Sequence, residues 1–348
     1  VRGMRQPHER AATAWDRMVA EGTAFDGDAI ISHEFFGGAS PDQAAKAMAR
    51  FSSAEIHVVV TARDLFGILP AMWQEQVKFG YTGRFEDYDP LPLEVRPARH
   101  WSWRTIDAAD VLRRWSVGLP PERVHVVTVP PAGSPRDLLW TRFAEACDFD
   151  PSVASLALPP VNESMGVAEA ELLRRVNTGL HEELRHSPGP ARWVRRYLGL
   201  EILAKRDGEK LRLPPGRVAG LRTRGEAIVA ELRKVGYHVV GDLDDLLGPA
   251  DPPMSRQPEE VGEGELLEVA VDLVNTMLAD HRALSLENAS LRSSLESVRA
   301  AVARRAGARA RRTPLSVARG VARRARRLMN DIPPEKRPVL EFACLRHG

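Results

Sequence analysis

Residues 267–302 contain a repeat of mostly apolar residues, spaced alternately three and four positions apart. These side chains become buried together only if the segment forms a long helix that faces another helix. This spacing, alternately three and four residues, marks the a and d positions of heptads and predicts a coiled coil of roughly 40 residues. Asn288 occupies an a position, where a buried amide favours two parallel strands, so we expect a homodimer. A single amphipathic helix packed on its own domain is the alternative. The repeat consists of Leu267, Ala270, Val274, Met277, His281, Leu284, Asn288, Leu291, Leu295, Val298 and Val302.

Three apolar, β-branched runs precede this repeat, at residues 29–36, 55–63 and 123–131. Runs this continuous suit strands buried on both faces, and the segments between them carry helical periodicity. The expected fold class is therefore α/β, a three-layer arrangement in which crossover helices cover a parallel sheet. A capping box at Ser40 predicts the start of one helix. Further helices are expected over residues 136–147, 167–183, 190–204 and 217–235.

Composition divides the chain into parts. Residues 1–248 form the expected α/β domain, and the stretch 249–264, rich in proline, glycine and charge, predicts a linker. Residues 265–304 form the expected coiled coil, and 305–348 form a basic tail.

The basic segment 299–327 contains 11 arginines and no acidic residue. On a helix its apolar side chains share one face and its arginines the other, which predicts binding to an anionic surface, either lipid head groups or nucleic acid. A solvated tail without a specific ligand is the alternative.

The two cysteines, Cys147 and Cys344, lie far apart without metal-ligand spacing. This excludes a disulfide framework and favours a reducing compartment. No run is apolar for long enough to cross a bilayer, so we expect a cytoplasmic protein, peripheral at a membrane if the tail binds lipid. Because the chain opens on Val1 and a helix rather than a strand, we expect a misplaced gene start or a truncated copy.

A histidine and a carboxylate end the first apolar run, where residues 28–38 read DAIISHEFFGG. At the carboxyl end of a parallel strand, side chains point into the crevice where α/β proteins bind ligands. His33 is suited to take a proton from an alcohol near neutral pH, and Glu34 can orient or support it. A structural histidine is the alternative.

Arg63 ends the second run at the same expected edge, where a guanidinium can hold a phosphate through two hydrogen bonds. A helix cap formed with Asp64 is the alternative. Gln74 and Lys78 follow, one turn apart on the polar side of the next helix. Together with Arg63 they form a candidate cofactor-binding group.

A polar cluster, PPVNESMG at residues 159–166, precedes a long helix. Asn162 and Ser164 in this cluster either cap that helix or line the same crevice as further cofactor ligands.

These segments, in this order, resemble the sulfotransferases that use 3′-phosphoadenosine 5′-phosphosulfate, in particular an actinobacterial group. The match covers roughly residues 10–248. It includes ISHEFFGG, HVVVTARDL, AMWQEQVK, RVHVVTVPP, LLWTRFAEACDFD, NESMGVAEAELLRRVN and GYHVVGDLDDLL.

The resemblance implies a fold of the P-loop type and transfer of a sulfuryl group from that co-substrate to a hydroxyl or amine, without a metal. His33 matches the family's base, with Glu34 as the alternative, and Arg63 matches an arginine on the 3′-phosphate. The family's serine on the same phosphate falls near Ala71, where this sequence departs from the pattern.

The family also has a glycine- and threonine-rich loop, whose backbone amides cradle the 5′-phosphosulfate at a helix N-terminus. No GxxxxGK[ST] stretch occurs in the 348 residues. We therefore expect the chain as printed to be inactive. The alternative is a non-catalytic dimeric adaptor, tethered to a membrane or nucleic acid by its coiled coil and basic tail. A transferase using a nucleotide-sugar donor is a third interpretation, without its usual acidic metal motif.

Overall fold

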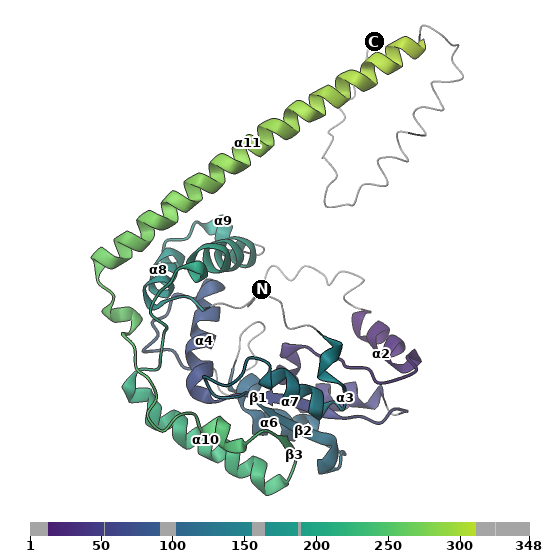
Figure 1. Ribbon diagram of the computed structural model, residues 1–348, viewed down its shortest axis with the longest axis vertical. Helices are drawn as coiled ribbons and strands as arrows, with labels where there is room; N and C mark the ends of the chain where they lie inside the picture. Colours follow the sequence, from purple (N-terminus) through teal and green to yellow (C-terminus); the bar gives the residue numbers. More distant parts are fainter. Residues whose placement is uncertain are drawn as a thin grey trace. The chain divides into compact units, whose positions relative to one another are not determined.

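The computed structural model describes residues 13–51, 53–90, 102–154, 164–186, 189–310 and 324. The described chain is mixed α/β and mostly helical, around an open parallel sheet with the strand order β1-β2-β3 (Figure 1). The strands are β1 (Val58–Ala62), β2 (Val124–Thr128) and β3 (His238–Val240). The second and third predicted runs are therefore confirmed as parallel strands, and the third strand lies in a segment for which no strand was predicted.

The first predicted run, 29–36, is not a strand, and this prediction was wrong. Residues 28–33 have no regular structure, and Glu34–Gly38 form the 3-10 helix η1. The polar interruption explains the difference: the Phe35 N–H donates to His33 Nδ1 (3.1 Å) instead of to a neighbouring strand. Ile30 and Phe35 are 58% and 56% exposed, so the run does not have the buried faces that a central strand requires.

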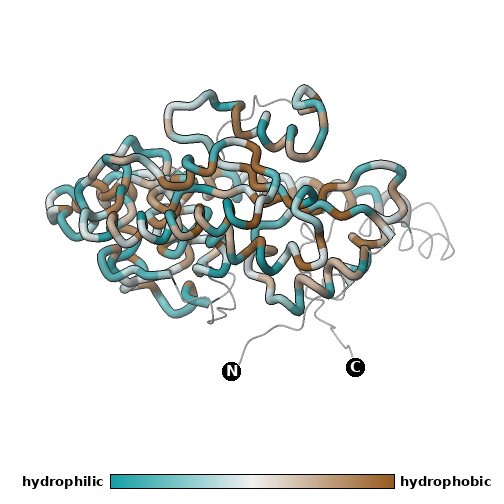
Figure 2. Tube along the Cα trace, turned by 90° about the horizontal axis from the view of Figure 1, so that it is seen from below, coloured by the Kyte–Doolittle hydropathy of each residue, from teal (hydrophilic) through white to brown (hydrophobic). Residues whose placement is uncertain are grey.

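Helices cover both faces of the sheet because its side chains alternate between them. Val124 and Val126 belong to the main core, which includes α4 (Leu65–Lys78), α6 (Ala108–Trp115) and α10 (Pro215–Val235). Val127 and Val240 pack on the opposite face against α7 (Leu138–Ala146). Hydrophobic and hydrophilic stretches are interspersed along the described chain (Figure 2).

The other helices follow the predicted order closely. The Ser40 capping box is present at the start of α3, with Gln43 as the reciprocal partner. Their bounds are α2 (Ala14–Ala24), α3 (Pro41–Ala49), α5 (Trp103–Ile106), α8 (Val167–Thr178), α9 (Glu182–Arg185), a π-helix η4 (Pro190–Ile202) and α11 (Glu263–Ala310). Short 3-10 turns are η2 (Pro121–Arg123), η3 (Pro151–Val153), η5 (Leu203–Lys205), η6 (Leu243–Leu247) and η7 (Pro258–Glu260).

The first turns of α11 belong to a compact unit formed by residues 1–274, and the rest belong to a second unit, 275–348. Leu266, Val269 and Leu273 are buried in the core of the first unit. Three ion pairs hold the same turns: Glu263 with Arg175, Glu265 with Arg256, and Asp272 with Arg206.

The segment predicted as a linker, 249–264, also contributes to the first unit, since Pro252, Pro258 and Val261 are buried. The domain bounds given above stay predictions. None of the described helices is both long enough and apolar enough to cross a membrane.

Candidate functional site at the carboxyl edge of the sheet

Arg63 follows β1 at the carboxyl edge of the sheet, and its side chain is 49% exposed. Its Nε lies 3.8 Å from Asp64 Oδ2, which is a loose contact. The cap of α4 is Asp64 itself, whose Oδ1 accepts from the Gly67 N–H at 2.8 Å. The guanidinium folds over this first turn, where a Cβ on Gly67 would lie 2.5 Å from Nη2. Arg63 therefore keeps donors for an anion, while its neighbour makes the cap.

Beside Arg63, the described residues enclose a cavity of only about 10 Å³, room for at most one water molecule. Its lining is apolar apart from Arg63, so the described residues fit a phosphate group at the guanidinium and not a whole nucleotide inside the fold. The lining consists of Ala62, Leu65, Ile106, Ala108, Gly225, Ile228 and Leu246.

Above β2 and β3, an ion pair between Arg142 and Asp245 occupies the same edge of the sheet. The sequence did not predict this pair. Arg142 Nη1 donates to Asp245 Oδ2 (2.8 Å) and to the Thr128 carbonyl (2.8 Å). Thr128 Oγ1 donates to Asp245 Oδ2 (2.9 Å) and accepts from the Asp242 N–H (3.2 Å). Gly241 has φ +106°, and a Cβ there would lie 2.1 Å from Thr128 Oγ1. Among the described residues, this ion pair occupies the edge above β2 and β3, whereas the exposed Arg63 lies on the β1 side.

His33 is exposed at the N-terminus of η1, and its ring orientation bears on its role as a base. Because Nδ1 accepts the Phe35 N–H, the neutral ring carries its proton on Nε2. The lone pair that would take a substrate proton is thus already engaged. Glu34, next along the turn, is also exposed. The base assignment of either residue stays a prediction, and His33 would have to break its backbone contact to perform it.

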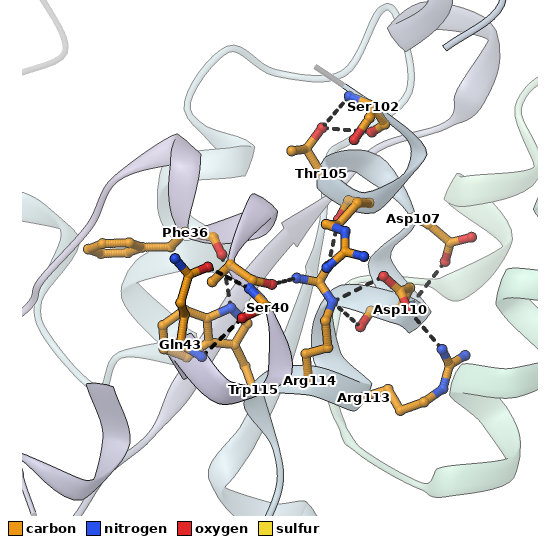
Figure 3. A network of polar contacts seen from close by, with 12 residues as sticks. Phe36, Ser40, Gln43, Ser102, Thr105, Asp107, Asp110, Arg113, Arg114 and Trp115 are labelled. Atoms are coloured by element: carbon orange, nitrogen blue, oxygen red, sulfur yellow. Dashed lines mark hydrogen bonds and ion pairs between the residues drawn. The ribbon is translucent and has the colours of Figure 1, made fainter. Parts of the chain in front are cut away.

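The turn that carries His33 is anchored on α5 and α6 (Figure 3). Trp115 Nε1 donates to the Phe36 carbonyl (2.9 Å), and Arg114 donates to the carbonyls of Ala39 and Arg104. A Cβ on Gly37 would lie 3.0 Å from the Thr105 carbonyl, which is why a glycine suits this contact. Ile106 and Ala108, next in the chain, line the Arg63 cavity, so both predicted groups border the junction of α5 and α6.

Gln74 lies elsewhere, buried on the side of α4 that faces α8. Its amide clamps the backbone of Met165: Nε2 donates to the carbonyl (3.1 Å), and Oε1 accepts the N–H (3.0 Å). Gln74 stands ten residues after the Asp64 cap, or about 15 Å along the helix at ~1.5 Å per residue. It therefore cannot share one phosphate with Arg63.

Lys78 is also buried, with Nζ 3.4 Å from Glu75 Oε2, and Arg195 pairs with the other oxygen of Glu75 at 2.6 Å. Ser164 is exposed immediately before Met165, whereas Asn162 lies outside the described residues. These four cofactor assignments stay predictions, and the contacts of Gln74 and Lys78 are those of structural residues.

We predict that Gln74→Ala lowers the free energy of unfolding by about 2 to 4 kcal/mol, because it strands two buried backbone groups of Met165 at ~1 to 3 kcal/mol each. Chemical denaturation measures this loss. Gln76→Ala is the matched control, since Gln76 lies on the same helix and is equally buried but does not clamp Met165. Equal losses for both variants would contradict a specific role of the clamp.

In the part of the chain that the structure describes, no group of three or more histidine, cysteine or acidic side chains is arranged to hold a metal ion. No protein-family model matches the chain, and no curated protein or solved structure proves similar to it. The resemblance to sulfotransferases therefore stays a prediction from the sequence.

Proposed function

We propose that this protein is a self-associating adaptor that dimerises through α11. The observation that carries the proposal is the exposed apolar stripe on that helix. The eight leucine, valine and methionine side chains of the 267–302 repeat are between 40% and 65% exposed in the single chain. Burying a leucine or valine side chain is worth ~1.5 to 3 kcal/mol, so this stripe favours a second helix.

The side chains that bury the first turns of α11 leave most of the repeat exposed for a second helix. Leu266, Val269 and Leu273 pack into the chain's own core, whereas Leu267 and Val274 are 65% and 53% exposed. This weighs against the alternative of a lone helix packed back on the domain, because Ala270 is the only apolar residue of the repeat that packs against that core.

Charge and polarity along the stripe favour a parallel second copy as the occupant. With Asn288 at an a position, Glu287 falls at g and Arg292 at the following e. In a parallel dimer a g residue faces the e residue five positions later in the partner, so Glu287 would pair with the partner's Arg292. In the single chain the Asn288 amide donates to its own helix, at the Leu284 carbonyl (2.9 Å). In the dimer it would meet the same amide of the partner.

Dimerisation would bring two basic segments together. Arg299, Arg304 and Arg305 of the segment 299–327 are exposed on α11. Paired cationic segments gain avidity on an anionic surface, and such binding falls steeply with salt. We propose a lipid or nucleic acid surface as the target.

The deciding measurement is the mass of the full chain in solution at micromolar concentration, by sedimentation equilibrium. A dimer is expected, and a monomer would contradict the proposal. Titration with phosphatidylserine vesicles and with duplex DNA at low salt then tests the tether. If neither binds, the adaptor loses its target while the dimer stands.

As a second candidate we propose sulfuryl transfer from 3′-phosphoadenosine 5′-phosphosulfate to a hydroxyl or amine, with His33 or Glu34 as the base. The observation that favours it is Arg63, half exposed at the carboxyl end of β1 and only loosely paired. The small cavity beside it and the engaged Nδ1 of His33 weigh against it. The adaptor therefore ranks first.

This candidate predicts that 3′-phosphoadenosine 5′-phosphate binds the full chain and that Arg63→Gln weakens binding about 10- to 100-fold, the worth of a charge-assisted contact. Isothermal titration calorimetry measures both. Arg84→Gln is the control, because Arg84 is equally exposed (51%) but comes after the C-terminal end of α4, whereas Arg63 precedes that helix. Absence of nucleotide binding in the unmodified protein would remove the candidate.

A further inference from the structure

The three strands share a sequence signal at their amino ends. The first residues of each strand overlap the tripeptide His-Val-Val, at residues 57–59, 125–127 and 238–240. The parallel register places His125 beside His238 and Val59 beside His125. His57 precedes Val59 by two residues and so shares its face of the sheet. All three imidazoles therefore lie on the α7 face, at the amino edge.

These imidazoles form one hydrogen-bonded row across the sheet. His57 Nδ1 lies 2.8 Å from His125 Nε2, and His125 Nδ1 lies 2.8 Å from His238 Nδ1. The row ends on a carboxylate, with His57 Nε2 3.0 Å from Glu55 Oε1. Arg123 Nη2 donates to the other oxygen of Glu55 at 2.7 Å. His125, at the centre, is 7% exposed.

The number of protons on the three imidazoles decides whether every contact in the row can be a hydrogen bond. With three neutral rings, every contact has one donor and one acceptor if all protons point toward Glu55. One further proton is accommodated, because a charged His57 beside Glu55 can donate to His125 and the row reverses direction. A second proton puts donors head to head in at least one contact. The folded row thus holds one extra proton, whereas three histidines in an unfolded chain take up three.

We propose that Glu55, His57, His125 and His238 form an acid-sensitive latch that ties the amino edge of the sheet together while the imidazoles are neutral and opens when two of them are charged. β3 is the strand released, since it has only three residues and lies at the sheet edge. Opening it would free the connection from α10 to η6.

The groups in and around the row favour neutral imidazoles and an ionised Glu55, which agrees with opening at low pH. Burial, then the charges of His238 and His57, lower the pKa of His125. The hydrogen bond from His57, followed by the charge of Arg123, lowers the pKa of Glu55 and keeps it an anion. The other titratable groups nearby are Glu122 of η2, which is exposed, and Arg142, Glu145 and Cys147 on or next to α7, of which Arg142 is engaged at the opposite edge.

A histidine with a lowered folded-state pKa stabilises the fold above the unfolded pKa, near 6.5, and loses that contribution as pH falls. Each proton taken up on unfolding changes the folding equilibrium about tenfold per pH unit. One to two such protons therefore predict a loss of up to about 10- to 100-fold between pH 6.5 and 5.5. Ordinary carboxylates titrate mostly below this window.

The test is urea unfolding of the full chain between pH 5.0 and 7.5 for the unmodified protein, His125→Gln and His181→Gln. The unmodified protein and His181→Gln, changed at an exposed histidine outside the row, are expected to show the full loss. Between pH 6.5 and 5.5, His125→Gln should lose up to about tenfold less stability than the unmodified protein, because one proton fewer is linked to unfolding.

Identical pH profiles for His125→Gln and the unmodified protein would overturn the latch. If His125→Gln does not fold at pH 7.5, His238→Gln at the exposed end of the row gives the same comparison. Amide hydrogen exchange supplies an independent measure: after correction for intrinsic rates, the β3 amides should exchange about tenfold faster at pH 5.5 than at pH 6.5. Unchanged protection of β3 would also overturn the proposal.

Discussion

Replacing Leu284 and Leu291 together with aspartate is expected to convert the protein from a dimer to a monomer at micromolar concentration. Both are d positions, 57% and 60% exposed in the single chain, and each would face its own copy in a parallel partner. The change removes four leucine contacts per dimer and juxtaposes like charges. At ~1.5 to 3 kcal/mol for each buried leucine, association should weaken by at least about 1,000-fold. Sedimentation equilibrium across a concentration series measures the loss.

Leu286→Asp is the matched control, because Leu286 is equally exposed (57%) but falls at position f, on the far side of the helix from the stripe. This variant should remain dimeric. Both proteins should keep the α/β unit intact, since residues 284–291 belong to the second compact unit. If Leu286→Asp dissociates the dimer as well, the interface lies on another face of α11. If neither variant dissociates it, the coiled coil is not what holds the copies together.

The sequence predicted those elements whose signal was both long and local. Two runs of continuous β-branched residues became β1 and β2, and the Ser40 capping box starts α3 where expected. The unbroken periodicity of 267–302 lies within α11, a single helix of 48 residues. In each case the pattern of neighbouring residues suffices, without knowledge of what packs against it.

Failures arose where tertiary contacts outweighed the local pattern. Residues 29–36 are apolar enough for a strand, yet three polar residues in the middle supply a side chain that competes for backbone hydrogen bonds. β3 was missed because three residues are too few to stand out, although its His-Val-Val sequence also occurs near the starts of β1 and β2.

In the candidate site, too, the sequence predicted locations that depend on local structure and missed those that depend on tertiary contacts. Sequence order placed Arg63 after a parallel strand, and that location is correct because it depends only on the strand. Gln74 and Lys78 were grouped with it by helical spacing alone, and spacing does not reveal that Met165 and Glu75 are their neighbours. Arg114, which holds the turn bearing His33, carried no signal in the sequence because its acceptors are backbone carbonyls far along the chain.

Arg114→Met is expected to lower the free energy of unfolding by about 3 to 5 kcal/mol, the usual loss when one partner of a buried ion pair is removed. Arg114 is 7% exposed, and its Nε lies 3.1 Å from Asp110 Oδ2. Burial lowers the pKa of this guanidinium, and Asp110 opposes the shift. The variant would strand the carbonyls of Ala39 and Arg104 as well as one oxygen of Asp110. Denaturant unfolding measures the change.

The neighbouring residue supplies the control. Arg113 also pairs with Asp110 (2.9 Å) and with Glu231, but its side chain is 55% exposed, so Arg113→Met should cost less than about 1 kcal/mol. A second measurement separates anchoring from general loss of stability. In Arg114→Met, at a denaturant concentration where both variants are mostly folded, the Phe36 and Ala39 amides should lose more protection against hydrogen exchange than the amides of β2. If β2 and the His33 turn lose protection equally, Arg114 supports the whole fold and does not specifically hold that turn in place.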